Sequence, residues 1–300
     1  MSITALLRCP RCGNENPADS FVCSFCGNRL KIESIENFFL FRRIEKEWIA
    51  PLQWYMKIYY LFRDPPRAFH DINHKRSAAP GYLILLLNSL LWGLMGLAFI
   101  SHFRFEPILT GFIFALSFFI VFFIFGLIFN FIFYTILTWL FIKGANYSVG
   151  FSERLETRFG GEKEVKEKYK KSEMSPFSIY KGGTLLQKQE AHKYKMLFCA
   201  YAPLLLINAI KILIILVAFP TVKIDTKEDV SLTRIFKSPI WAVLDIMDAL
   251  TIAIWVPILM TLAIRDLSNS STLRVLISSL AIGGFIAVIF YFLRPTLFGI

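Results

Sequence analysis

The sequence lacks the short motifs that mark the common classes of soluble enzyme. It contains no Walker loop, no Gly-x-Gly-x-x-Gly dinucleotide fingerprint and no Gly-x-Ser-x-Gly elbow. After residue 26 it has a single cysteine, Cys199, which falls in an apolar run and is expected to be a small buried hydrophobe. Since no nucleophile, general base and catalytic metal come together in the sequence, we predict that the protein is not an enzyme.

The apolar content is instead that of an integral membrane protein. Hydrophobic residues make up 55% of the 300 residues, phenylalanine occurs 31 times and the mean hydropathy is +0.53. Five runs with few or no charges are long enough to cross about 30 Å of hydrocarbon as helices. We expect spans at about 81–102, 107–142, 196–219, 240–264 and 275–293. The predicted fold is an all-α membrane protein built as a five-helix transmembrane bundle.

The second run is too long for one upright crossing. From Ile108 to Phe141 it has 34 uncharged residues, and such a helix is about 51 Å long at 1.5 Å per residue. That length is short for two crossings and a turn, and the run contains no proline or Asn-Gly pair at which the chain could reverse. One long tilted helix is the favoured interpretation, with a hairpin as the alternative.

Lysine and arginine are unevenly distributed between the segments that flank these runs. Residues 1–80 and the loop 143–195 carry twelve each, whereas 220–239 carries four. Because cytoplasmic segments are enriched in these residues, the bias predicts a cytoplasmic N-terminus and, after five crossings, a C-terminus outside. The net charge of +11 then reflects topology and attraction to anionic lipid headgroups. No nucleic-acid partner is expected, since the basic residues are not interleaved with a stacking platform.

Four cysteines near the N-terminus predict a metal site. Cys9 and Cys12 form one Cys-x-x-Cys pair and Cys23 and Cys26 the other, each pair followed by glycine. Two such turns complete a tetrahedral shell of four thiolates, which suits Zn²⁺. The closed shell leaves no position for water or substrate, so we expect a structural zinc and a small zinc ribbon over residues 1–30. Two disulfides are the alternative, disfavoured because no secretory signal precedes Cys9.

Two further segments are expected to lie outside the hydrocarbon. In residues 31–76, aromatic residues alternate with lysines and arginines, which is typical of an amphipathic juxtamembrane helix with its aromatics at headgroup depth. A soluble helix packed on the loop 143–195 is the alternative, and Asp64-Pro65-Pro66 must interrupt either helix. Within that loop, the charged run 153–173 predicts a solvated helix.

Charged residues inside the apolar runs are costly and need partners. Lys211 lies in the third run, and Asp245 and Asp248 lie three residues apart in the fourth. Their distances from the outer ends of the runs place them at comparable depth, so we predict that Lys211 pairs with one or both carboxylates. Such an ion pair either locks two helices together or forms part of a proton or ion relay, and the first interpretation is favoured because no further acidic or histidine relay is evident.

Four features of residues 50–295 resemble the Yip family, the Ypt/Rab-interacting multispan membrane proteins, in its prokaryotic form. Before the first span, Leu61-Phe62-Arg63-Asp64-Pro65-Pro66-Arg67-Ala68-Phe69 is similar to the family's Asn-Pro-x-x-x-Phe segment. Gly182-Gly183 resembles the Gly-Gly turn before the third span, and Ala200-Tyr201-Ala202-Pro203 resembles the Ala-Tyr-x-x-Pro start of that span. The fourth feature is the expected count of five spans with a cytoplasmic N-terminus. Residues 77–300 would then form a Yip-like membrane domain, with 144–180 as an insertion.

The resemblance implies a non-enzymatic membrane scaffold or adaptor with a role in membrane organisation or trafficking. Its expected partners are anionic lipid headgroups and a cytoplasmic protein that binds the ribbon; the resemblance to the family makes a small GTPase one candidate for that protein. The alternative function is a small transporter or channel that uses Lys211, Asp245 and Asp248. The sequence leaves the oligomeric state open.

Overall fold

The computed structural model describes residues 6–17, 20–23, 25–26, 28–44, 51–74, 78–104, 108–151, 192–223 and 238–298. The chain divides into two compact units. Unit 1 comprises Met1–Pro80, Trp139–Cys199 and Ile258–Ser279, and unit 2 comprises Gly81–Thr138, Ala200–Pro257 and Leu280–Ile300.

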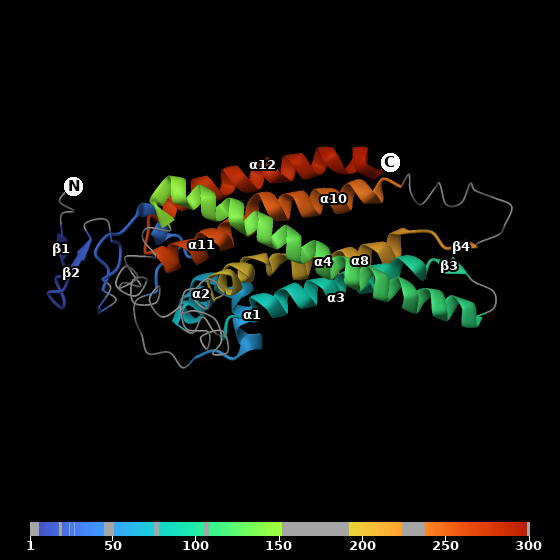
Figure 1. Ribbon diagram of the computed structural model, residues 1–300, viewed down its shortest axis with the longest axis horizontal. Coiled ribbons are helices and arrows are strands. Elements are labelled where there is room, and N and C mark those ends of the chain that lie inside the picture. The colour runs from blue at the N-terminus through green and yellow to red at the C-terminus, as the bar shows by residue number, and fades with distance from the viewer. Residues whose placement is uncertain are drawn as a thin grey trace, which may run out of the picture. The chain divides into compact units, whose positions relative to one another are not determined.

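The described part of the chain is mostly helical and contains five helices long and apolar enough to cross a membrane (Figure 1). Three of them are single helices: α3 (Gly81–Ile100), α4 (Ile108–Val149) and α12 (Thr272–Phe298). The third span, His192–Ala218, contains the 3₁₀ turn η4 (Phe198–Tyr201) and helix α8 (Pro203–Ala218). The fourth, Ile240–Ser268, contains α10 (Ile240–Leu250), the π-helical η5 (Thr251–Trp255) and α11 (Val256–Ser268). All five coincide with expected spans, and these lengths fit a multi-pass membrane protein.

The second expected span is one continuous helix and not a hairpin. Helix α4 has 42 residues and is about 63 Å long at 1.5 Å per residue. It continues to Val149, beyond the expected end at residue 142, because Lys143 and Asn146 bring charge and polarity but nothing that interrupts a helix. It ends at Gly150, whose left-handed φ of 64° lets its N–H bond the carbonyl of Asn146 at 3.0 Å.

Unit 2 is held together by close helix packing. A Cβ atom on Gly93 or Gly96 of α3 would lie only 2.8 Å from the ring of Phe119 or Phe122 of α4, so α3 and α4 approach closely at these glycines. Helices α3, α8 and α10 share an apolar cluster, centred on the buried residues Ala98, Ile215, Phe219 and Leu244. Beside it, the two-residue strands β3 (Phe103–Arg104) and β4 (Val222–Lys223) pair in parallel.

Unit 1 gathers the N-terminal segment around several helix ends. Its first element is an antiparallel hairpin of β1 (Leu6–Arg8) and β2 (Glu15–Pro17), followed by the 3₁₀ turn η1 (Ser34–Asn37), α1 (Trp54–Arg63) and α2 (Pro65–His74). The helix ends in this unit are the C-terminal ends of α4 and α11, the N-terminal end of α12 and residues 192–199. Ends of these kinds lie on one side of a membrane when successive helices cross it in alternating directions.

The juxtamembrane segment is only partly helical. Residues 31–44, expected to belong to an amphipathic helix, are irregular apart from η1, because their polar side chains bind other parts of unit 1 instead of solvent. Helices α1 and α2 are separate, and the break falls at Asp64 as expected. The charged run 153–173 and the Gly182-Gly183 pair lie outside the described residues.

Candidate metal centre and intramembrane ion pair

The first cysteine knuckle is shaped by backbone hydrogen bonds. The N–H of Cys9 bonds the carbonyl of Asn14 at 2.9 Å, and the N–H of Gly13 bonds the carbonyl of Cys9 at the same distance. Gly13 has a φ of 74°, a conformation that glycine adopts without strain. In the second half of the ribbon the N–H of Cys23 bonds the carbonyl of Asn28 at 2.8 Å, as that of Cys9 bonds the carbonyl of Asn14 in the first.

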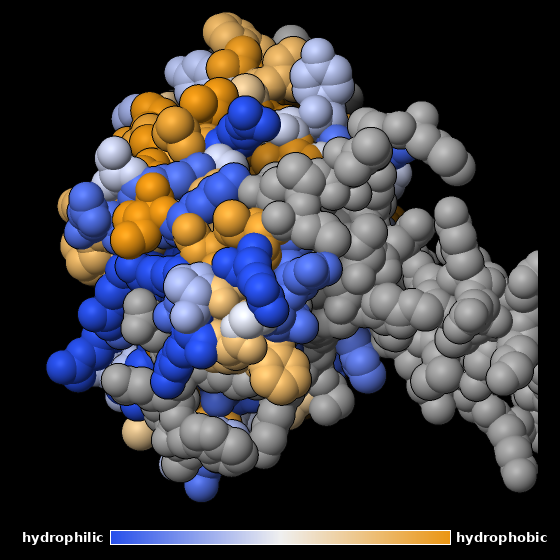
Figure 2. Space-filling view, turned by 90° about the vertical axis from the view of Figure 1, so that its left-hand side faces the viewer, coloured by the Kyte–Doolittle hydropathy of each residue, from blue (hydrophilic) through white to orange (hydrophobic). Residues whose placement is uncertain are grey.

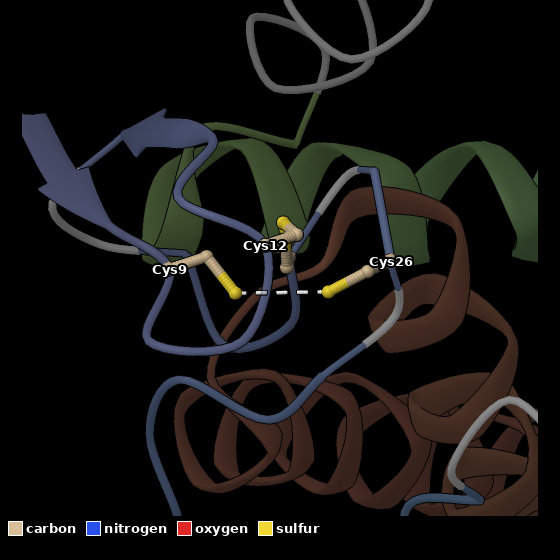
Figure 3. A group of neighbouring side chains, drawn as sticks. Cys9, Cys12 and Cys26 are labelled. Atoms are coloured by element: carbon tan, nitrogen blue, oxygen red, sulfur yellow. Dashed lines mark hydrogen bonds between the residues drawn. The ribbon is translucent and has the colours of Figure 1, made fainter.

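The four sulfur atoms converge on one point. The Sγ atoms of Cys9 and Cys26 are 3.6 Å apart (Figure 3). Those of Cys12 and Cys23 are 3.7 Å apart, and all four lie within 4.8 Å of one another. A tetrahedral Zn²⁺ with Zn–S bonds of about 2.3 Å would place its sulfurs about 3.8 Å apart. Four close cysteines of this geometry can hold a metal ion and are consistent with zinc.

None of the four cysteines forms a disulfide in this structure. A disulfide needs an S–S distance of about 2.05 Å, and all five described cysteines are free. Cys199 lies away from the group and is fully buried, in agreement with its expected role as a small hydrophobe.

The surroundings of the cysteines favour thiolates at two positions. Burial alone would raise the pKa of Cys9 and Cys23, but backbone N–H groups within each knuckle outweigh it; they lower the pKa of Cys9 and bring that of Cys23 to about 6. Cys12 is different: the backbone N–H of Asn14 favours its thiolate, but burial and the neighbouring sulfurs raise its pKa to about 12. Negative charge therefore accumulates until one thiol keeps its proton, and a divalent cation would relieve that repulsion.

A buried amide supports the second knuckle. The side chain of Asn16 is fully buried, and its Nδ2 donates to the Sγ of Cys23 at 3.5 Å and to the carbonyl of Asn14 at 2.9 Å. Hydrogen bonds of this kind stabilise a thiolate and fix the direction of its lone pairs. Nothing in the sequence distinguished Asn16 from Asn14, because both are polar residues of a short loop.

In unit 2, Lys211 of α8 lies against Asp248 of α10. The Nζ atom donates to Oδ1 at 2.8 Å and to Oδ2 at 2.7 Å, and the Lys211 side chain is 8% exposed. Asp245 lies one turn before Asp248 on the same helix. One turn before Lys211, the Nδ2 of Asn208 donates to the Oδ1 of Asn88 at 3.1 Å, so two polar pairs join α8 to its neighbours.

The residues that carry the family resemblance occupy structural positions. Pro65 is the first residue of α2, where its missing N–H costs nothing, and Phe69 is fully buried in the same helix. Pro203 begins α8. Tyr201 stacks on Tyr134 with ring centroids 4.1 Å apart, and its hydroxyl shares a hydrogen bond with that of Thr138 at 2.9 Å. Gly182 and Gly183 lie outside the described residues.

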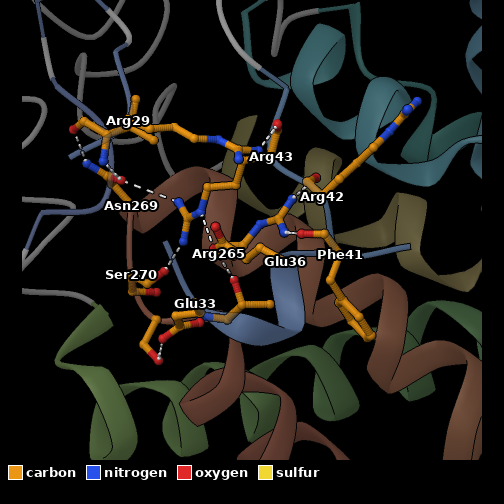
Figure 4. Close-up of polar contacts among 12 residues, drawn as sticks. Arg29, Glu33, Glu36, Phe41, Arg42, Arg43, Arg265, Asn269 and Ser270 are labelled. Carbon is orange, nitrogen blue, oxygen red and sulfur yellow. Dashed lines mark hydrogen bonds and ion pairs between the residues drawn. The ribbon is translucent and has the colours of Figure 1, made fainter. Parts of the chain in front are cut away.

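Unit 1 contains a group of buried charged residues that no local pattern in the sequence indicates. Arg265 at the end of α11 is 1% exposed, and the Arg43 and Glu36 side chains are 5% and 0% exposed. They join residues 29–43 to the turn between α11 and α12 (Figure 4). A charge beside a long apolar run is usually a solvated flank, so only the long-range contacts identify these three as buried.

Comparisons with models of known protein families, with curated protein sequences and with solved structures gave no match. The metal centre and the ion pair are therefore interpreted from their own geometry.

Proposed function

We propose that this protein is a non-enzymatic scaffold or adaptor of the membrane, similar to Yip-family proteins, whose zinc ribbon binds a cytoplasmic protein. The observation that carries the proposal is the closed group of four sulfurs within 4.8 Å of one another. A metal ion with four protein ligands has no position for a reacting molecule, so its role is to shape a surface.

The ribbon offers a surface suited to a protein partner. Phe25, between the ligands Cys23 and Cys26, is 71% exposed, and Arg11, between Cys9 and Cys12, is also exposed. Figure 2 views the end of unit 1 that carries β1 and β2, where hydrophilic residues predominate and apolar ones are scattered among them. Exposed aromatic residues and arginines are both enriched at protein interfaces. The resemblance to the Yip family points to a small GTPase as the partner.

Helices α1 and α2 provide a second contact, with anionic lipid headgroups. Trp54, Tyr55 and Tyr59 on α1 are 57%, 50% and 48% exposed, and the guanidinium of Arg63 donates to the Tyr59 hydroxyl at 2.8 Å. The opposite side of α1 is anchored in unit 1, because the buried Lys57 pairs with Asp71 of α2 at 3.2 Å. Exposed aromatics with an arginine beside them, in the segment that precedes the first span, suit the headgroup region.

Capture from native membranes tests the adaptor role. We expect a partner that co-purifies with the full chain and with Ile32→Ala, a control at another exposed apolar residue, but not with Phe25→Ala or Cys12→Ser. The purified partner should likewise bind the full chain and Ile32→Ala but not Phe25→Ala or Cys12→Ser. A partner set that is identical for all four proteins would contradict the proposal.

Transport remains the second candidate, and the contact between Lys211 and Asp248 is the observation in its favour. A relay requires groups that can exchange protons or ions within the membrane. The triple variant Lys211→Met/Asp245→Asn/Asp248→Asn would abolish proton or cation flux into proteoliposomes if the protein were a transporter. For a scaffold, partner capture by this variant is expected to be unchanged.

A further inference from the structure

The second half of the ribbon is attached to the turn that joins the fourth and fifth spans. Asn269, in that turn, accepts a hydrogen bond from the N–H of Val22 at 2.9 Å and donates one to its carbonyl at 2.7 Å. The amide thus pairs with Val22 as a neighbouring strand would. Asn269 adopts a left-handed φ of 52°, which orients its side chain toward the ribbon. Val22 directly precedes the metal ligand Cys23.

Two buried arginines extend this attachment (Figure 4). Arg43 donates to Glu36 at 2.6 Å and to the carbonyl of Ser270 at 2.5 Å, and its guanidinium lies 4.9 Å from the centre of the Phe21 ring. Arg265 donates to the carbonyl of Phe41 at 2.5 Å. Burial, and next the charge of Arg265, lower the pKa of Arg43, although Glu36 opposes this. Every one of these contacts depends on residues 21–43 following one fixed path.

Glu33 on the same path completes the start of the last helix. Its Oε2 accepts hydrogen bonds from the backbone N–H groups of Thr272 at 2.8 Å and Leu273 at 3.1 Å, and its Oε1 accepts one from Ser271 Oγ at 2.5 Å. Ser271 in turn accepts the N–H of Arg274 through its side chain, and that of Val275 through its carbonyl. The first four N–H groups of α12 are therefore all satisfied, two of them by a residue that is distant in sequence.

The ribbon has almost no apolar core to hold this path in place. Among its described residues, the buried side chains are Cys9, Cys23, Asn16 and Ser20. Two of them are candidate metal ligands, and Asn16 bonds the sulfur of one. A segment of this size without an apolar core depends on its metal for folding. Loss of the metal would therefore free Val22 and, with it, the chain that carries Glu33.

We propose that metal binding by the ribbon clamps the turn between α11 and α12 and so fixes the adjoining ends of the fourth and fifth spans. The ion then acts on the membrane domain as well as on the ribbon surface. This inference rests on the metal centre and not on the scaffold role, so its failure would leave the proposed function standing.

Hydrogen exchange on the full chain in lipid nanodiscs tests the clamp. We compare zinc-loaded protein with protein stripped by a chelator, and follow a peptide that covers residues 268–275. Loss of the Glu33 cap is expected to raise exchange at the amides of Thr272 and Leu273 by about fivefold to tenfold. Unchanged exchange at these amides after the metal has left would overturn the proposal, as would an equal rise in α3, because that would mean general unfolding.

Two variants separate the clamp from the ion itself. Asn269→Gly keeps the left-handed backbone accessible but removes the amide that pairs with Val22, so exchange at the turn should rise while zinc content stays the same. Glu33→Gln should raise exchange at Thr272 and Leu273 by a smaller factor, whereas Glu15→Gln, at an exposed ribbon residue, should change nothing. If the turn in zinc-loaded Asn269→Gly exchanged no faster than in the zinc-loaded unchanged protein, the clamp would be refuted.

Discussion

Unit 1 and unit 2 are stabilised by different means. In unit 1, guanidinium groups and carboxylates bind backbone groups across long sequence distances, as the buried Arg265 binds the carbonyl of Phe41 and Glu33 binds the N–H of Thr272. In unit 2, glycines allow apolar helices to touch, and the main charged contact among its described residues is that of Lys211 with Asp248. The difference shows where irregular backbone needs partners: helices satisfy their own N–H and C=O groups, whereas the irregular residues 31–44 must find partners elsewhere.

Acidification is expected to have the largest effect, and it should act through unit 1. With a pKa of about 12, Cys12 must release a proton to bind zinc at neutral pH. Cys23, with a pKa lowered to about 6, remains a thiolate above that pH and takes up a proton below it. As the pH is lowered, the apparent zinc affinity should fall by at least about tenfold for each unit down to pH 6. Below pH 6 it should fall by at least about a hundredfold for each further unit.

Competition with a chromophoric zinc chelator, from about pH 8 to about pH 5, measures this dependence on the full chain. Cys199→Ser is the matched control, because it removes a cysteine outside the cluster and should leave the curve unchanged. An affinity that does not vary with pH would contradict ligation by thiolates.

Breaking the ion pair of unit 2 is expected to have the next largest effect. Lys211→Met leaves Asp248 without its ammonium partner among apolar helices, which should lower the free energy of unfolding by about 3 kcal/mol. The double variant Lys211→Met/Asp248→Asn removes both charges and should recover most of that loss. Thermal unfolding in detergent micelles measures both, and a double variant as unstable as the single one would argue against the pair.

In unit 1 the matching change breaks the ion pair of Glu36 with Arg43, and its effect on stability can be compared with that of Lys211→Met. Glu36→Gln removes the carboxylate that binds Arg43, but the amide oxygen can still accept a hydrogen bond, and Arg43 lies outside the candidate spans. We expect a loss of about 1–2 kcal/mol. If Glu36→Gln lowered the free energy of unfolding more than Lys211→Met does, the ion pair of unit 1 would be the more important of the two.

The smallest effect is expected at Gly284, one of two adjacent glycines of α12 in unit 2. A Cβ on Gly283 would lie 2.4 Å from Pro257 Cγ and 2.7 Å from the carbonyl oxygen of Ile252, whereas one on Gly284 would meet nothing within 4 Å. Gly283→Ala should lower stability by about 1–3 kcal/mol, and Gly284→Ala should raise it by about 0.5–1 kcal/mol because alanine favours helix. The same thermal unfolding measurement compares them, and equal effects would show that steric packing does not decide stability here.

The sequence was a good guide to unit 2 and a poor one to unit 1. The five apolar helices coincide with the expected runs, and Lys211 lies within hydrogen-bonding distance of one of the two predicted carboxylates. A charge in an apolar run is conspicuous because it has so few candidate partners. In unit 1, by contrast, Glu33, Glu36 and Arg43 belong to a segment rich in charges, and nothing local distinguishes those that are buried. The expected helix over residues 31–44 was wrong for the same reason, since aromatic and basic residues suit an amphipathic helix and an irregular chain equally well.

By itself the sequence determined the apolar spans, the single long helix α4, the break at Asp64 and the four sulfurs that can share one ion, because each follows from a local pattern or from transfer out of water. Only the tertiary structure decided that Asn16 supports Cys23, that Asn269 pairs with Val22 and that Glu33 caps α12. For each of these contacts the sequence offers many other polar side chains as partners. Only the folded path of the chain determines which of them meet.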